Sequence, residues 1–159
     1  MNTALKPLAL IYKVNTTLLI NSFTDVTEEF SLKRPNKKTN SMMFLLLHTI
    51  DARYFMLKYT GVNIKNPFGK YIDWANTIED LIEYPKLKRV LSEWKKLDKV
   101  FTDKLNRFRS KQLDKELDME FPGGRKVLNM ITFLAEHEAY HVGQLAFIRK
   151  YLGLKAVTF

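Results

Sequence analysis

Cysteine is absent from the 159-residue sequence. No disulfide can therefore form within the chain, and neither a thiolate metal site nor a cysteine nucleophile is available. Since nothing in the cysteine usage supports secretion, we expect a cytoplasmic protein. Metal binding or catalysis has to use histidine, carboxylate or other nitrogen and oxygen groups.

The sequence also lacks long apolar runs. A helix that spans a bilayer needs about 20 consecutive apolar residues, whereas the apolar segment near the N-terminus is interrupted by Lys6, Pro7, Lys13 and Asn15. The same interruptions argue against the apolar core of a signal peptide. We therefore expect no membrane partner.

What is present is the composition of a globular domain. Hydrophobic residues make up 46% and charged residues 27% of the chain, which is enough apolar material for a packed core. Because domains usually contain about 100–150 residues, we expect residues 1–159 to form a single domain.

Positive charge is concentrated in one segment. The net charge is +9, and residues 86–115 contain eleven Lys or Arg against four Asp or Glu. Apolar residues at helical spacing separate these charges, which favours a solvated helix face over an anion-binding surface. No helix-turn-helix or zinc-finger pattern is present, so we expect no specific nucleic-acid partner.

Apolar residues that recur every three to four positions predict four long helices. The expected ranges are 5–20, 42–59, 85–108 and 125–152. Thr77 and Asp80 have capping-box spacing and predict a further short helix, which Pro85 interrupts. The expected fold class is all-α, a four-helix bundle.

The connection before the last helix is elaborated. Leu117, Met119 and Phe121 alternate with charged residues up to a Pro-Gly-Gly sequence at 122–124. This alternation predicts a short extended segment that closes on a turn.

All three histidines of the chain lie on apolar helical stripes. His137 and His141 stand four positions apart, which places both imidazoles on one helix face, about 40° apart. His48 belongs to a stripe on the second long helix, with Phe44, Ala52, Phe55 and Tyr59. Separately hydrogen-bonded core histidines are one interpretation; a shared divalent ion satisfies all three together. We favour one ion, with zinc, nickel or iron(II) all acceptable to imidazole.

The segment from His137 to His141 also spells HExxH, the helical motif of zinc peptidases in which Glu138 is the general base. The 18 residues after His141 contain no Asp, Glu or His that would supply the downstream ligand. We therefore favour other functions over a peptidase. For Glu138 we favour the role of a hydrogen-bond acceptor near the metal ligands over that of a general base.

Other positions carry weaker signals. Gly143 inside a helix costs about 1 kcal/mol relative to alanine, which suggests close approach of another helix, as in a homodimer. Asp51 lies one turn beyond His48 and is a candidate to orient a ligand, with a surface carboxylate as the alternative. Further residues near the motifs have no assigned role: Arg53, Tyr140, Gln144 and Arg149.

The stretch from His137 to Leu145, continuing to Arg149, resembles the last-helix signature of the DinB-like (DinB/YfiT) metal-binding superfamily. His48, within the segment from Leu47 to Arg53, is similar to that family's second-helix histidine. The resemblance implies an antiparallel bundle with a long crossover between helices two and three, a metal triad and homodimerisation.

The same resemblance implies several activities. Members are similar to metal-dependent transferases that use a low-molecular-weight thiol such as bacillithiol, mycothiol or glutathione, or to maleylpyruvate isomerases and hydrolases. We therefore expect a metal-dependent enzyme that activates water or such a thiol for transfer or hydrolysis on a small-molecule substrate. The alternative is a non-catalytic, metal-stabilised bundle that acts as a stress-related binding protein.

Overall fold

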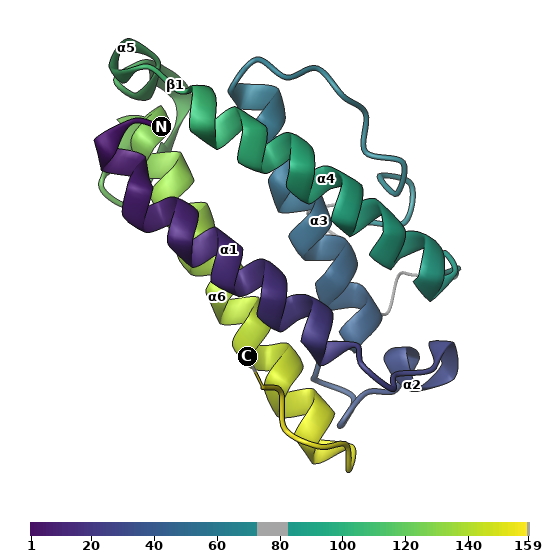
Figure 1. Cartoon of the computed structure of the whole chain (residues 1–159). Coiled ribbons are helices and arrows are strands. Elements are labelled where there is room, and N and C mark those ends of the chain that lie inside the picture. The colour runs from purple at the N-terminus through teal and green to yellow at the C-terminus, as the bar shows by residue number, and fades with distance from the viewer. Residues whose placement is uncertain (73–82, 159) are drawn as a thin grey trace.

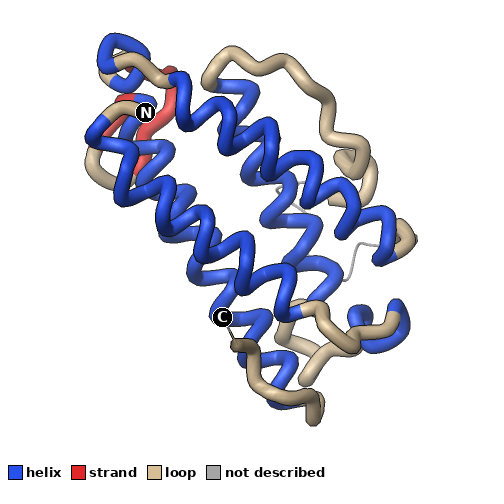
Figure 2. The backbone as a smooth tube through the Cα atoms, viewed as in Figure 1, coloured by secondary structure: helices blue, strands red, loops and turns tan. Residues whose placement is uncertain are grey.

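The computed structural model describes residues 1–72 and 83–158. Four long helices dominate it (Figure 1): α1 Lys6–Ser22, α3 Met42–Tyr59, α4 Leu87–Arg107 and α6 Val127–Tyr151. Shorter elements lie between and before them (Figure 2): η1 Thr3–Leu5, α2 Glu28–Leu32, α5 Ser110–Leu113, β1 Glu116–Phe121 and β2 Gly124–Lys126.

The four long helices pack in a ring. α1 contacts α6, α6 contacts α3, α3 contacts α4, and α4 contacts α1. Tyr12 and Asn15 of α1 donate hydrogen bonds to the carbonyls of Ile131 and Ala135 of α6, in the same order along both helices. α1 and α6 therefore run in the same direction. α3 and α4 both run the other way (Figure 1), so a long crossover carries the chain from the end of α3 back to the start of α4.

The predicted ranges of the long helices are confirmed to within two residues at each end. Ser41 caps α3, with its hydroxyl accepting a hydrogen bond from the Phe44 backbone amide at 3.2 Å. Gly61 and Gly153 follow α3 and α6 with φ of +86° and +92°, the left-handed conformation that ends many helices. The predicted capping pair Thr77 and Asp80 lies outside the described residues.

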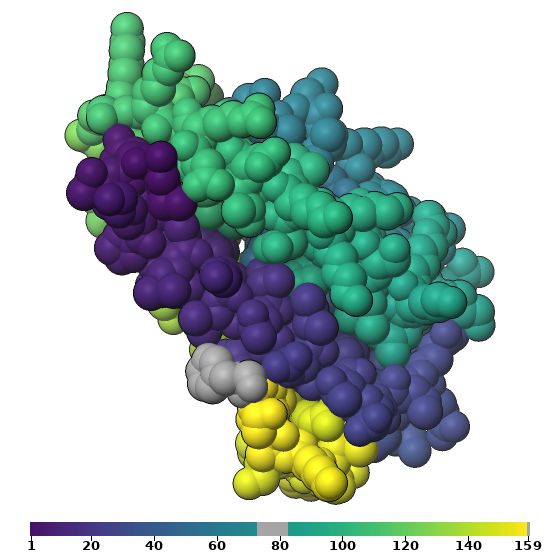
Figure 3. All heavy atoms as spheres, in the orientation of Figure 1, coloured from purple at the N-terminus to yellow at the C-terminus, as the bar shows by residue number. Residues whose placement is uncertain are grey.

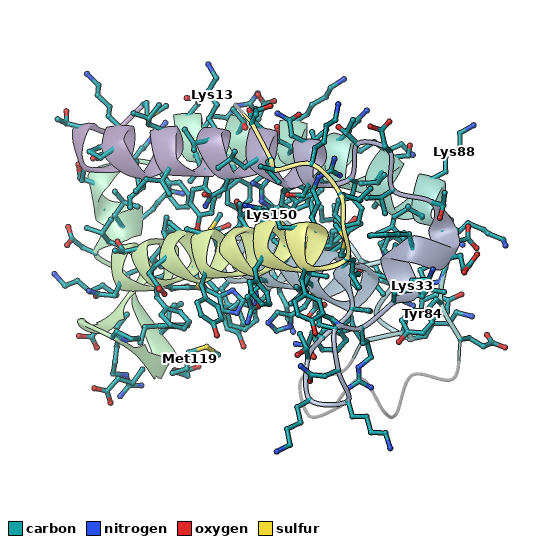
Figure 4. The ribbon with its side chains drawn as sticks, turned by 90° about the horizontal axis from the view of Figure 1, so that it is seen from below. Lys13, Lys33, Tyr84, Lys88, Met119 and Lys150 are labelled. Carbon is teal, nitrogen blue, oxygen red and sulfur yellow. The ribbon has the colours of Figure 1, made fainter. Side chains whose placement is uncertain are left out.

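The chain is mostly helical, but the all-α prediction omits a small sheet. The predicted extended segment is confirmed as β1, and it pairs antiparallel with β2. Pro122 and Gly123 form the turn, and Gly123 and Gly124, the first residue of β2, have φ of +90° and +122°. A Cβ at Gly123 would also lie 2.9 Å from the side-chain nitrogen Nδ2 of Asn129. The hairpin extends below α6 in Figure 4, where Met119 is labelled.

α4 divides cleanly into an apolar and a basic face. Its buried residues keep helical spacing: Leu87, Val90, Trp94, Leu97, Phe101 and Leu105. The lysines of the opposite face are exposed, and Figure 4 shows Lys88 projecting outward. Most of the local positive charge is therefore solvated.

α3 is buried on most of its circumference, as the long list of its buried residues from Met42 to Leu57 shows. The stripe that contains His48 is the exception. His48, Ala52, Phe55 and Tyr59 are all half-buried, although their spacing alone resembles a core face. No described helix is long and apolar enough to cross a membrane.

Candidate metal centre

The three histidines meet between α3 and α6. The Nε2 atom of His137 lies 3.1 Å from Nε2 of His48 and 3.0 Å from Nε2 of His141. One ring nitrogen from each histidine lies within 4.8 Å of the corresponding nitrogens of the other two. The i, i+4 spacing on α6 brings two of the rings together, and the packing of α3 on α6 adds the third.

Burial keeps these imidazoles neutral. Desolvation, reinforced by His141, lowers the pKa of His48 to about 4. Desolvation also lowers the pKa of His137 to about 4, with both other histidines contributing. The pKa of His141 is lowered by desolvation too, although Gln144 and Glu136 oppose the shift. Neutral rings have nitrogen lone pairs for a metal at physiological pH.

Gln144 fixes the tautomer of His141. Its Oε1 lies 2.7 Å from Nδ1 of His141, and since an amide oxygen only accepts, Nδ1 carries the proton. Nε2 of His141 therefore has a free lone pair directed toward the other two rings. A hydrogen bond to the far ring nitrogen commonly orients metal-binding histidines in this way.

The donor set fits a divalent ion better than a purely hydrogen-bonded trio. His137 Nε2 has either one proton or one lone pair, so it cannot make two full hydrogen bonds to its neighbours. Its Nδ1 is buried with no hydrogen-bond partner in the described structure. Three nitrogens bound tetrahedrally at about 2.0–2.1 Å from one ion stand about 3.3 Å apart. Two of the three pairs, at 3.0 and 3.1 Å, are close to this separation, and all three nitrogens lie within 4.8 Å of one another.

Glu138 points away from the triad into the helix packing. Its carboxylate accepts hydrogen bonds from Arg53 Nε at 2.7 Å and Arg53 Nη2 at 2.9 Å. Both residues are 2% exposed. Burial raises the pKa of Glu138, while Arg53 counteracts the shift. The carboxylate is thus engaged by a charged partner, on a different face of α6 from His137.

Arg53 of α3 contacts all three of the other long helices, since Glu138 belongs to α6. Its Nη1 donates to Asp98 of α4 and its Nη2 to Thr16 of α1, each at 2.7 Å. Its guanidinium carbon stands 3.9 Å from the ring centroid of Trp94 and 4.5 Å from that of Phe101. Aromatic faces stabilise a cation held in this way.

A groove of about 630 Å³ reaches this network from the other side. It lies between α1 and α4, on the face shown in Figure 3, and both Thr16 and Asp98 line it. The side chain of Asp98 is 30% exposed. The network therefore has a buried end at Glu138 and a hydrated end at Asp98.

Sequence reasoning left Arg53 without a role and did not identify Asp98 or Thr16. One signal was present: an arginine in the middle of the most apolar helix needs a buried anion as partner. The partner itself cannot be read from spacing, because Glu138 lies 85 positions further along the chain.

The remaining candidates have diverse surroundings. Asp51 accepts a hydrogen bond from Asn66 at 2.7 Å. Arg149 is buried and donates to the carbonyls of Ser22 and Lys155, so it joins the C-terminal segment to the end of α1. Gly143 is exposed, and an added Cβ would meet nothing within 4 Å. Tyr140 is 59% exposed, and its ring centroid stands 5.3 Å from that of His141.

Comparison with known proteins identifies the family of the chain and a solved structure of the same fold. The family model of the DinB superfamily matches residues 12–145, and the chain belongs to that superfamily. The matched range includes every residue of the histidine cluster.

A solved structure shares the fold. It is a crystal structure of a conserved protein from Enterococcus faecalis, similar with a TM-score of 0.72 at 14% identity, covering 96% of this chain and 98% of that one. No curated protein matches the sequence.

Proposed function

We propose that the protein is a metal-dependent enzyme whose divalent ion is held by His48, His137 and His141. The convergence of the three Nε2 atoms carries the proposal. When bound, an ion on these three imidazoles would supply a Lewis acid that activates water or a thiol. Zinc, nickel and iron(II) all suit this donor set.

The chain's own residues have distinct tasks in this proposal. Gln144 holds His141 in the tautomer whose Nε2 faces the ion. Glu138 serves the packing of α3 on α6 through Arg53 and is not the general base. This assignment argues against a peptidase, because the HExxH mechanism needs its glutamate beside the metal.

The same proposal covers the reaction and the assembly. The substrate is a small molecule, and the activated group is water or a low-molecular-weight thiol, for hydrolysis or transfer. We propose that residues 1–159 form one domain, an antiparallel four-helix bundle built of α1, α3, α4 and α6, that assembles as a homodimer in the cytoplasm. The directions and the ring packing of the four helices support the bundle.

Elemental analysis tests the site. After incubation with zinc, nickel or iron(II), the purified protein should contain about one ion per chain. His48→Ala should abolish the stoichiometric binding, while the exposed neighbour variant Glu136→Gln should retain it. An unchanged metal content in His48→Ala would eliminate a site shared by α3 and α6.

Turnover separates the enzyme from the non-catalytic alternative. The metal-loaded protein should transfer or hydrolyse a small electrophile in a thiol or water assay, and a chelator should stop the reaction. If metal changes only the melting temperature, and no electrophile is turned over with any thiol tested, the metal-stabilised binding protein replaces the enzyme.

A further inference from the structure

The groove between α1 and α4 has a volume of about 630 Å³ and lies on the face shown in Figure 3. Toward one end the hydroxyl of Thr16 donates to Oδ1 of Asp98 at 2.8 Å. Toward the other end Asn2, before α1, donates to Ser110, after α4, at 2.9 Å. Because a helix rises about 1.5 Å per residue, the lining of α1 from Thr16 back to Lys6 is about 15 Å long. The lining residues recur at helical spacing on both helices: Lys6, Ala9, Lys13 and Thr16, and Asp98 and Leu105.

The polar network at the Thr16 end has one negative charge in excess. The guanidinium of Arg53 supplies one positive charge, and the carboxylates of Glu138 and Asp98 supply two negative ones. Both oxygens of Glu138 accept hydrogen bonds from Arg53, which is the arrangement of an ionised, charge-paired carboxylate. Asp98 shares the same guanidinium through a single bond. The uncompensated charge is therefore located at Asp98, where the network reaches the groove.

Asp98 has acceptor capacity for a ligand. Its hydrogen bonds from Thr16 Oγ1 and Arg53 Nη1, at 2.8 and 2.7 Å, are both made to Oδ1. An ionised carboxylate has about four acceptor sites on its two oxygens. The side chain is 30% exposed and lines the groove. A donor in the groove, and above all a cationic one, can therefore bind at Oδ2.

The rest of the groove offers apolar contact and a basic rim. Leu105 is 2% exposed, while Leu10 is 62% exposed, so a bound hydrocarbon chain would remove apolar surface of Leu10 from water. Lys6 and Lys13 line the rim and are exposed. These two lysines and the net charge of +9 favour an anion, whereas Asp98 favours a cation. The two interpretations predict opposite ligands.

We propose that the groove between α1 and α4 is a binding site, separate from the histidine cluster, for a small primary amine. The ammonium group binds Asp98, and the apolar chain lies along Leu10 and Leu105. An ammonium has three donors and one positive charge, so it compensates the excess charge of the network at its hydrated end. A buried or partly buried charge-assisted hydrogen bond is stronger than a bond to a mobile lysine at the rim. The volume is within the range of small-molecule pockets.

Three probes with the same chain separate charge from apolarity: hexylamine, hexan-1-ol and hexanoate. At about pH 7 the amine is protonated and the acid is ionised. Each probe is titrated into ¹⁵N-labelled full-length protein at about 0.15 M salt, where charges beyond about 8 Å are largely screened. Dissociation constants are taken from the amide shifts of residues 9–17 and 98–106. The titrations use chelator-treated protein and are repeated with zinc, since shifts beside the groove distinguish this site from binding at an ion.

Hexylamine should bind about ten-fold more tightly than hexan-1-ol, because its bond to Asp98 is charge-assisted. Apolar burial alone predicts equal or tighter binding of the alcohol, since an ammonium loses more hydration. Hexanoate should bind at least about ten-fold more weakly than hexylamine. If the lysines of the rim governed the site, hexanoate would be the tightest of the three.

Asp98→Asn tests the assignment of the carboxylate. The variant preserves an oxygen acceptor for Thr16 and Arg53 but removes the charge, so the advantage of hexylamine over hexan-1-ol should fall to about two-fold or less. Asp103→Asn is the matched control, since Asp103 is on the same helix, is exposed and pairs with Arg107 at 3.6 Å. It should behave as wild type.

Leu10→Ser locates the apolar chain and replaces Asp98→Asn if that variant does not fold, since the exposed Leu10 side chain is not needed for the core. It should weaken hexylamine and hexan-1-ol alike, by about three-fold or more, through lost apolar contact. Ile11→Ser is its control, because Ile11 is the next residue of α1, is 40% exposed and lies outside the groove.

Equal or tighter binding of hexan-1-ol or hexanoate in the wild-type protein would overturn the inference, and this comparison needs no variant. Equal effects of Asp98→Asn and Asp103→Asn would overturn it too, as would equal effects of Leu10→Ser and Ile11→Ser. Shifts confined to residues outside the groove would do the same. The site does not depend on the proposed function: a protein that binds hexylamine as expected but no metal would refute that function and leave the amine site standing.

Discussion

Arg53 and Glu138 form a two-bonded ion pair at 2.7 and 2.9 Å between α3 and α6, with both residues 2% exposed. The pair lies at the level of the histidine cluster, because Glu138 directly follows His137 in the chain. The same two helices are therefore joined by the ion pair at one point and by the three imidazoles at the adjacent one.

Removing one partner of this pair should destabilise the protein strongly. Glu138→Gln or Arg53→Met leaves an uncompensated buried group, and we expect a loss of about 3–5 kcal/mol in the free energy of unfolding. Urea denaturation followed by circular dichroism measures it. As a control, Glu29→Gln at the exposed pair with Lys33 should cost under about 1 kcal/mol.

The double variant Arg53→Met with Glu138→Leu should recover part of this loss, because apolar pairs replace buried ion pairs at small cost. If the losses in the free energy of unfolding of Arg53→Met and Glu138→Leu simply add up in the double variant, the direct contact between the two side chains would be contradicted.

Chelation should lower the thermal stability of metal-loaded protein. A ligand at about 100 times its dissociation constant stabilises the native state by about 2.7 kcal/mol, which corresponds to about 5–10 °C for a domain of this size. Calorimetry with and without EDTA measures the shift. His48→Ala should show no chelator effect, and an effect as large as that of wild type would place the ion elsewhere.

Gln144→Ala should weaken metal binding without removing it. The substitution leaves Nδ1 of His141 without its acceptor, so the tautomer that exposes Nε2 is no longer enforced. Losses of hydrogen bonds to metal ligands typically cost about 10–100-fold in affinity. Competition with a chromogenic chelator measures the dissociation constant, and Gln144→Glu, which preserves an oxygen acceptor, should restore most of it.

Gly143 offers a test of the proposed homodimer. An added Cβ meets nothing within 4 Å in the single chain, so Gly143→Ala should stabilise the monomer by about 0.5–1 kcal/mol through helix propensity. If α6 approaches a second copy at this position, the larger Gly143→Leu should weaken the dimer. Light scattering across a concentration series reports the mass, and a wild-type value near 18.7 kDa at high concentration would exclude the dimer.

The long helices were predictable because their evidence is local. Apolar spacing, the cap at Ser41 and the glycines after α3 and α6 all act within a few residues. The partner strand β2 and the helix α2 were not predicted, because each is too short for periodicity to reveal. The half-buried stripe of His48, Phe55 and Tyr59 was taken for a core face, since spacing does not distinguish the core from an apolar functional face.

The sequence by itself determined which helices form and that His137 and His141 share a face, because the 3.6-residue repeat sets both. Only the tertiary structure decided that His48 joins them and that Arg53 meets Glu138, Asp98 and Thr16. Those contacts depend on how α1, α3, α4 and α6 pack, and they join side chains as distant in sequence as His48 and His141. Periodicity places a residue on one face of its own helix. The packing of the helices decides which side chain of another helix that residue contacts.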